Sequence, residues 1–212
     1  MDIIDSRVIW ISSNKNTPNE MKEMLLFHFL DSWINGASVQ IERISIDQLK
    51  HKKALRELSE NIKTGRGHKQ DWVEHQKRLF LDIHFFLVAI ANISKIIESL
   101  RRIKSKEPEF VVICKKYESN LARLRYIFRN ILEHMTDGPI HGHNKKGKPL
   151  KNPGDFGNLS NGNYSLFGET FNLPKTFVTF KALRKDLKNW SDEQVEKIYA
   201  RIRPKGETQP FL

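Results

Sequence analysis

The residues with the clearest capacity for chemistry lie in the string Arg129-Asn130-x-x-x-His134. A histidine titrates near neutral pH, so it can move a proton to or from a hydroxyl group. A guanidinium carries a fixed positive charge and binds a phosphate through two parallel hydrogen bonds. Together these groups suit a reaction in which one group moves a proton while the other stabilises negative charge on a phosphate.

The spacing of the three residues limits how they can act together. Residues five apart on a regular helix differ by about 140° in direction, so Arg129 and His134 do not share a face, whereas Asn130 and His134 do. A site that uses both needs a distorted helix or a second copy of the chain. The alternative is that Arg129 and Glu133 form an ordinary surface pair, while His134 caps the end of the helix.

A second group of residues could bind a metal ion. His134, Asp137, His141 and His143 combine imidazoles with a carboxylate, which are ligands for zinc or manganese. They fall in a glycine-rich stretch that offers no fixed scaffold. We therefore treat this metal site as the weaker alternative and expect no cofactor.

Two long helices are expected to position the catalytic candidates. Apolar residues recur at three- and four-residue spacing from about residue 71 to residue 106, and the stretch 83–91 is apolar nearly all round, which predicts a central helix. Asp82 on this helix needs a partner, expected from a basic residue of the next helix. After Pro108, a pattern close to a heptad predicts that next helix over 109–135. The short turn between them predicts an antiparallel pair in an up-and-down helical bundle.

The other elements are shorter. Thr17-Pro18-Asn19-Glu20 is a strong helix start, and Asn35-Gly36 is expected to end that helix. Strands are expected at 7–12 and 38–46, a further helix at 47–62, a small hairpin at 164–171, and two final helices at 175–189 and 191–203. The predicted fold class is mainly α, with small β elements.

These elements divide the chain into four regions. Residues 1–66 are an N-terminal segment with short strands and two helices, and residues 67–136 are the central helical hairpin. Residues 137–174 form a loop rich in Gly, Asn and Pro that contains four of the 8 Pro and most of the 11 Gly, which favours a functional loop. Residues 175–212 hold the C-terminal helices, assigned to the same domain as the bundle.

The string Arg129-Asn130-x-x-x-His134 resembles the signature of the HEPN superfamily, which is Arg, a polar residue, a variable spacer and His near the end of a long paired helix. The resemblance covers roughly residues 71–134. It implies a four- or five-helix bundle that forms a homodimer, with activity as a metal-independent endoribonuclease of the kind found in toxin–antitoxin and phage-defence systems. By this resemblance Arg129 and His134 are the active-site pair, Asn130 is their polar companion, and a cognate antitoxin or regulatory protein is an expected partner.

The charge distribution favours RNA as the substrate. The formal net charge of the 212 residues is +11, and residues 101–151 alone carry 13 Lys and Arg against 5 Asp and Glu. Lysines after the motif could follow a phosphate backbone, and tyrosines could stack on unpaired bases. The predicted RNA-binding residues are Lys145, Lys146, Lys148, Lys151, Tyr126 and Tyr164. For any single lysine, a solvated basic loop is the simpler interpretation.

Composition excludes several other classes of protein. A hydrophobic content of 39% with 13 Phe excludes wholesale disorder, and the single cysteine, Cys114, excludes an internal disulfide. The sequence has no run of 18 uncharged apolar residues and no signal-peptide pattern, so we expect a cytoplasmic protein outside the membrane. The alternatives to a nuclease are a non-catalytic helical module that binds RNA or protein, and a purely structural bundle.

Overall fold

The structure is a computed structural model that describes residue 4 and residues 18–64, 71–127, 156–160, 162–166 and 169–202. Within these ranges the chain forms four helices and a three-stranded antiparallel sheet. The helices are α2 (Pro18–Lys63), α3 (Asp71–Ile103), α4 (Pro108–Ile127) and α5 (Leu173–Ile202), and the strands are β1 (Phe156–Ser160), β2 (Asn163–Leu166) and β3 (Glu169–Asn172). The predicted mainly α class with small β elements is confirmed. The strand expected at 7–12 lies outside the described residues.

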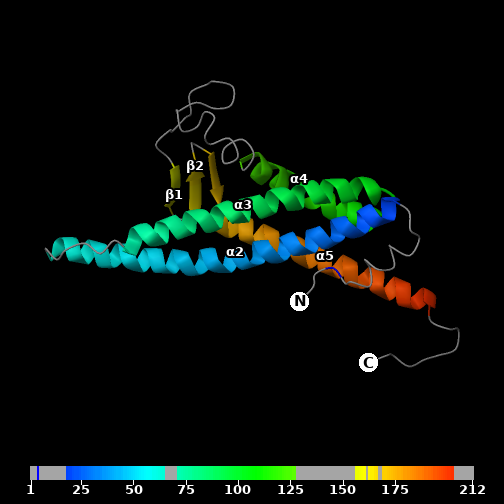
Figure 1. Ribbon diagram of the computed structural model, residues 1–212, viewed down its shortest axis with the longest axis horizontal. Helices are drawn as coiled ribbons and strands as arrows, with labels where there is room; N and C mark the ends of the chain where they lie inside the picture. Colours follow the sequence, from blue (N-terminus) through cyan, green and yellow to red (C-terminus); the bar gives the residue numbers. More distant parts are fainter. Residues whose placement is uncertain are drawn as a thin grey trace, which may run out of the picture.

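The long helices lie alongside one another, and the sheet stands to one side of them near the start of α5 (Figure 1). Helices α2 and α3 share the longest contact, and α4 returns along α3 after the turn at 104–107, as the sequence predicts. The segment Val73–Ile103 is long and apolar enough to span a membrane by length and composition alone. Half of its most apolar window is buried in this structure.

Helix α2 is one continuous helix of 46 residues, so the predicted end at Asn35-Gly36 and the predicted strand at 38–46 are both wrong. The apparent alternation of branched residues is a helical stripe. Ile34, Ala37, Ile41 and Ile44 are buried at three- and four-residue steps, whereas Val39 and Ile46 are exposed. Packing of this stripe outweighs the low helix propensity of Gly and β-branched residues.

Helix α5 is also continuous, so the predicted break between 189 and 191 is wrong. Trp190 is 2% exposed and Ser191 is fully buried, so both are held inside the bundle. Lys188 and Asp192 form an ion pair across the expected break, with Nζ 2.9 Å from Oδ1. Tertiary packing therefore keeps the helix continuous through this position.

An aromatic cluster joins three of the helices at one end of the bundle. Phe27 of α2 lies 5.5 Å from Trp190 of α5 and 6.0 Å from Phe110 of α4, measured between ring centroids. Phe110 and Trp190 are themselves 4.8 Å apart. Because each ring touches the other two, the positions of α2, α4 and α5 are fixed relative to one another.

The buried carboxylate of Asp82 is paired with a residue that the sequence did not indicate. Its Oδ1 lies 3.0 Å from Nη2 of Arg43 on α2, so the expected partner on α4 is a wrong prediction. The Asp82 side chain is 2% exposed and that of Arg43 is 60% exposed. Burial raises the pKa of Asp82, and Asp47 raises it further, while Arg43 lowers it.

The small hairpin predicted at 164–171 is present as β2 and β3. The two strands pair antiparallel, with Tyr164 opposite Phe171 and Leu166 opposite Glu169. Strand β1 pairs with the other edge of β2. The expected turn residue Gly168 lies outside the described residues.

We expect the substitution Gly36→Ala to stabilise the protein. Gly36 lies inside α2, and a Cβ atom added there meets nothing within 4 Å. Alanine in a helix interior is favoured over glycine by about 0.5–1 kcal/mol, so the free energy of unfolding in urea should rise by about that amount. Ala37→Gly, at the neighbouring buried position, should lower the free energy of unfolding. A loss of stability in Gly36→Ala would contradict this prediction.

We expect Arg43→Ala to lower the free energy of unfolding by about 2 kcal/mol at neutral pH, because it leaves the buried Asp82 carboxylate without its cation. Asp82→Asn should cost less, because a neutral amide needs no counter-charge. The double variant should have the same free energy of unfolding as Asp82→Asn alone. Additive losses in this double-mutant cycle would show that the two side chains are not coupled.

The same pair predicts a pH dependence of stability. Because the folded state raises the pKa of Asp82 above 3.8, it binds that proton more tightly than the unfolded state does. The stability that the folded state gains from this tighter proton binding is fully present below pH 3.8. It is lost as the pH rises through the raised pKa of Asp82. Relative to Asp82→Asn, the wild type should therefore lose stability over this interval, measured by urea unfolding at a series of pH values.

Candidate functional site

Helix α4 leads directly into the motif that the sequence singled out. Its inner face is the predicted seam, whose buried members are Phe110, Cys114, Tyr117, Leu121, Leu124 and Ile127. Ile127 is fully buried and is the last described residue before the motif. The seam therefore fixes the direction of the chain up to two residues before Arg129.

Most predicted site residues lie outside the described residues. This holds for the three catalytic candidates, for the four lysines and for the remaining members of the alternative metal site: Arg129, Asn130, His134, Lys145, Lys146, Lys148, Lys151, Asp137, His141 and His143. Within the described ranges, no group of three His, Cys, Asp or Glu side chains could hold a metal ion.

The two tyrosines predicted to stack on RNA bases have different environments. Tyr126, in the last turn of α4, is 56% exposed, which is the placement that stacking requires. Tyr164 is 2% exposed, and its ring packs 5.4 Å from that of Phe171 within the core. Because its faces are covered by protein, Tyr164 is not placed for the stacking role expected of it.

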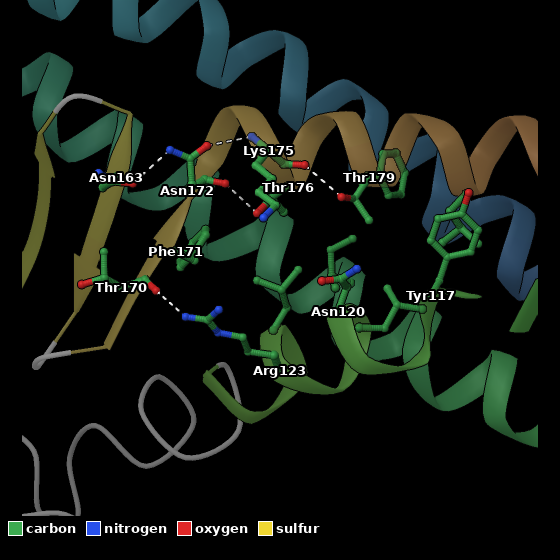
Figure 2. Close-up of a pocket in the computed structure, with 15 residues that line it drawn as sticks. Tyr117, Asn120, Arg123, Asn163, Thr170, Phe171, Asn172, Lys175, Thr176 and Thr179 are labelled. Carbon is green, nitrogen blue, oxygen red and sulfur yellow. Dashed lines mark hydrogen bonds between the residues drawn. The ribbon is translucent and has the colours of Figure 1, made fainter. Parts of the chain in front are cut away.

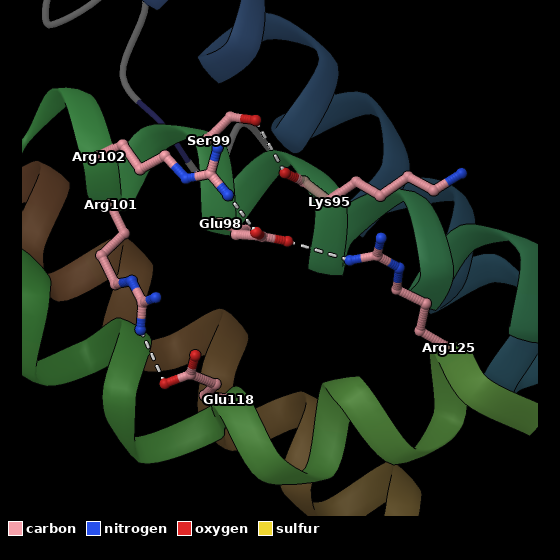
Figure 3. A network of polar contacts seen from close by, with 7 residues as sticks. All are labelled: Lys95, Glu98, Ser99, Arg101, Arg102, Glu118 and Arg125. Atoms are coloured by element: carbon pink, nitrogen blue, oxygen red, sulfur yellow. Dashed lines mark hydrogen bonds and ion pairs between the residues drawn. The ribbon is translucent and has the colours of Figure 1, made fainter.

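A network of arginines and glutamates joins α3 to the last turns of α4 (Figure 3). Glu98 accepts hydrogen bonds from Arg102 of its own helix and, at 3.1 Å, from Arg125 of α4. These guanidinium groups lower the pKa of Glu98, with the hydrogen bond from Arg125 as the largest cause. Arg101 makes a second bridge, 2.7 Å from Glu118. The network holds Arg125 in place four residues before Arg129.

The basic residues at the turn between α3 and α4 are largely matched by carboxylates. The Lys104 ammonium group lies 2.6 Å from Glu23 and 2.7 Å from Glu107, and its side chain is 14% exposed. Although burial opposes the charge, these carboxylates raise the pKa of Lys104. Lys104 therefore ties the turn to α2 and is not part of a free basic surface.

A pocket of about 300 Å³ lies between α4, the strands β2 and β3, and the first turns of α5 (Figure 2). Its lining residues come from α3, α4, β2, β3 and α5: Ile90, Tyr117, Asn120, Leu121, Arg123, Leu124, Asn163, Thr170, Phe171, Asn172, Lys175, Thr176, Thr179, Phe180 and Leu183. Among the described residues, the lining includes two cations, Arg123 and Lys175, and no carboxylate. Its electrostatic character therefore favours an anion.

Hydrogen bonds join the strands to the helices around this pocket. Arg123 Nη2 of α4 donates to the Thr170 carbonyl of β3 at 2.9 Å. At the start of α5, Asn172 Oδ1 accepts from the Lys175 backbone N–H at 2.8 Å, which is the geometry of an N-cap. The Asn172 amide in turn donates to Asn163 Oδ1 at 3.0 Å. These hydrogen bonds thus join side chains of α4, β2 and β3 to one another and to the backbone of β3 and α5.

Gly162 allows the turn between β1 and β2 to approach α5 closely. Its φ of +78° favours glycine, and an added Cβ would lie 3.2 Å from Cδ of Pro174. Its carbonyl accepts a hydrogen bond from the Leu173 N–H at 2.9 Å. This contact fixes the start of α5, which carries Lys175 into the pocket.

The pocket residues were not recognised from the sequence. Arg123 and Lys175 are 52 positions apart and share no motif. The one local signal is Asn172-Leu173-Pro174, an N-cap followed by proline, which places the helix start before the expected residue 175. Nothing in the sequence indicates that this start faces α4.

Comparisons with known proteins add no information about the site. No family model, no curated protein and no solved structure matches the chain.

We expect Glu98→Gln to strengthen binding of single-stranded RNA by about threefold at low salt, because it removes the carboxylate that neutralises Arg102 and Arg125. Fluorescence anisotropy with a labelled oligonucleotide would measure the affinity. Glu193→Gln makes the same change in net charge on the exposed surface of α5 and serves as the control. Equal changes in RNA affinity for the two substitutions would show that the effect comes from net charge and not from the network around Glu98.

Proposed function

We propose that the protein is a metal-independent endoribonuclease of the HEPN type. The observation that carries the proposal is the string Arg129-Asn130-x-x-x-His134, which begins two residues after the described end of α4. Helix α4 is the second member of an antiparallel helical pair, which is the setting in which the family's motif occurs.

The proposed reaction breaks the phosphodiester without an external nucleophile. His134 accepts the proton of a 2′-hydroxyl group, and the 2′-oxygen attacks the adjacent phosphorus. The bond from phosphorus to the 5′-oxygen breaks, and that oxygen takes up a proton. The products are a 2′,3′-cyclic phosphate and a 5′-hydroxyl. Arg129 stabilises the charge that develops on the phosphate, and Asn130 orients one of the two groups.

The helical spacing supports a homodimer as the active form. On a regular helix Arg129 and His134 point about 140° apart, so one chain does not bring both to the same phosphate. A second copy, packed with its own motif against the first, would supply the missing group. The proposal therefore includes a homodimer, and it also includes a regulatory partner protein.

The described surface near the motif supports RNA as the substrate. Tyr126 is exposed and lies four residues before Asn130 in the sequence, and Arg123 and Lys175 line a pocket that has no carboxylate among its described lining residues. Both features suit a polyanion with exposed bases. Neither requires cleavage, so they support equally the alternative of a non-catalytic RNA-binding module.

The test is cleavage of a labelled single-stranded RNA in the presence of EDTA. We expect the wild type to cut the RNA, and Arg129→Ala and His134→Ala each to lower the rate by about 100-fold or more, because each loses a group that acts in the transition state. Mass spectrometry of the fragments should find cyclic phosphate ends.

His143→Ala is the matched control, because it removes a neighbouring histidine that belongs only to the alternative metal site. It should cleave like the wild type. Equal rates for all variants, or activity that depends on added metal, would refute the mechanism. Binding that survives His134→Ala with no cleavage by any variant would favour the non-catalytic module.

A further inference from the structure

We infer that the pocket between α4, β3 and α5 binds one unpaired nucleotide of a single-stranded RNA. The base would lie between the apolar walls, and its phosphate would lie on Arg123 and Lys175. The inference deepens the proposed function by naming the form of its substrate, and it rests on that function for the identity of the polymer.

The charges of the lining select an anion. Lys175 is exposed and forms no ion pair with a described residue, and Arg123 uses Nη2 for its hydrogen bond to Thr170. A guanidinium has five N–H donors, so donors remain for a ligand. With two cations from different helices and no carboxylate in the lining, the pocket would bind an anionic group at its rim.

The walls of the pocket indicate that the anion carries an apolar body. Seven lining side chains are aliphatic or aromatic: Ile90, Tyr117, Leu121, Leu124, Phe171, Phe180 and Leu183. A bare phosphate would make no use of these side chains. The volume of about 300 Å³ is at the lower end of the range for small-molecule sites, so one base fits and a longer segment does not.

Amides and hydroxyls in the same lining suit the polar edge of a base. Asn120 lines the pocket from α4 and has no hydrogen-bond partner among the described residues. Thr179, across the pocket, donates its hydroxyl proton to the Lys175 carbonyl at 3.0 Å, which leaves its oxygen as an acceptor. A nucleobase presents both donors and acceptors at its edge, so it can satisfy such a pair of groups.

The position of the pocket favours an RNA chain over a free mononucleotide. Arg123 precedes Arg129 by six residues on the same segment, and Tyr126 stands exposed between them. A chain that places one base in the pocket could therefore place a neighbouring base toward Tyr126, three residues after Arg123 on α4. A base can enter only when it is unpaired, so the substrate form is single-stranded.

The experiment measures binding of a labelled single-stranded RNA of about 12 nucleotides to the full chain carrying His134→Ala, which avoids cleavage during the measurement. Thr179→Phe is added to fill the pocket without changing its charge. We expect it to weaken RNA binding by about tenfold, the loss of one buried base, and to leave binding of polyphosphate unchanged. Asn120→Phe fills the pocket from the opposite wall and should act in the same way.

Charge variants provide matched controls. Lys175→Gln should weaken RNA binding more than Lys181→Gln, which removes the same charge from an exposed residue of α5 that does not line the pocket. Thermal unfolding by circular dichroism checks that each variant folds. A photoreactive uridine in the RNA should form crosslinks to Phe171 or Tyr117, located by mass spectrometry.

Three results would overturn the inference. One is unchanged RNA binding in both pocket-filling variants, and another is an equal loss of RNA and polyphosphate binding. The third is binding of uridine monophosphate as tight as that of the oligonucleotide, which would make the ligand a free nucleotide. The proposed function has a separate test. It fails if the wild type does not cleave RNA, even when both pocket-filling variants weaken RNA binding and so support the pocket.

Discussion

Apolar side chains of α3 are removed from water by several neighbouring helices, and the arrangement of the other elements follows from this burial. Phe86, for example, is fully buried and meets the rings of Phe177 and Phe180 of α5 at 5.4 and 6.1 Å. A helix with this much apolar surface gains its stability from covering helices, not from its local propensity. α2 and α4 cover it on other sides. The pocket exists because α5 begins beside this packing and β3 is attached to that beginning.

The polar interactions distinguish cations that hold the helices together from the two cations that line the pocket. Arg43, Arg101, Arg102, Lys104 and Arg125 each face a carboxylate across or along the helices. These pairs fix how the helices lie against one another, most of all where the carboxylate is buried. Arg123 and Lys175 have no carboxylate partner among the described residues. The two cations of the pocket are therefore available to a ligand, whereas those that join the helices are offset by carboxylates.

The pocket and the motif are joined by α4, whose buried seam ends at Ile127. Because that seam is packed against the core, Arg123, Arg125 and Tyr126 are held on a rigid element immediately before Arg129. A binding group held in this way can position a substrate for residues that follow it. The proposed nuclease and the proposed nucleotide pocket are therefore parts of one arrangement, although each depends on different side chains.

The sequence by itself determined the helical class, the pairing of α3 with α4, the buried seam of α4 and the hairpin of β2 and β3, because each follows from periodicity or turn chemistry within a short stretch. It also supplied the motif at Arg129 and His134. Only the tertiary structure decided that α2 and α5 continue through their expected breaks, that Arg43 pairs with Asp82, that Tyr164 is buried, and that Arg123 and Lys175 line one pocket. These outcomes depend on contacts between residues far apart in the chain, and such contacts outweigh local propensities of about 1 kcal/mol per residue.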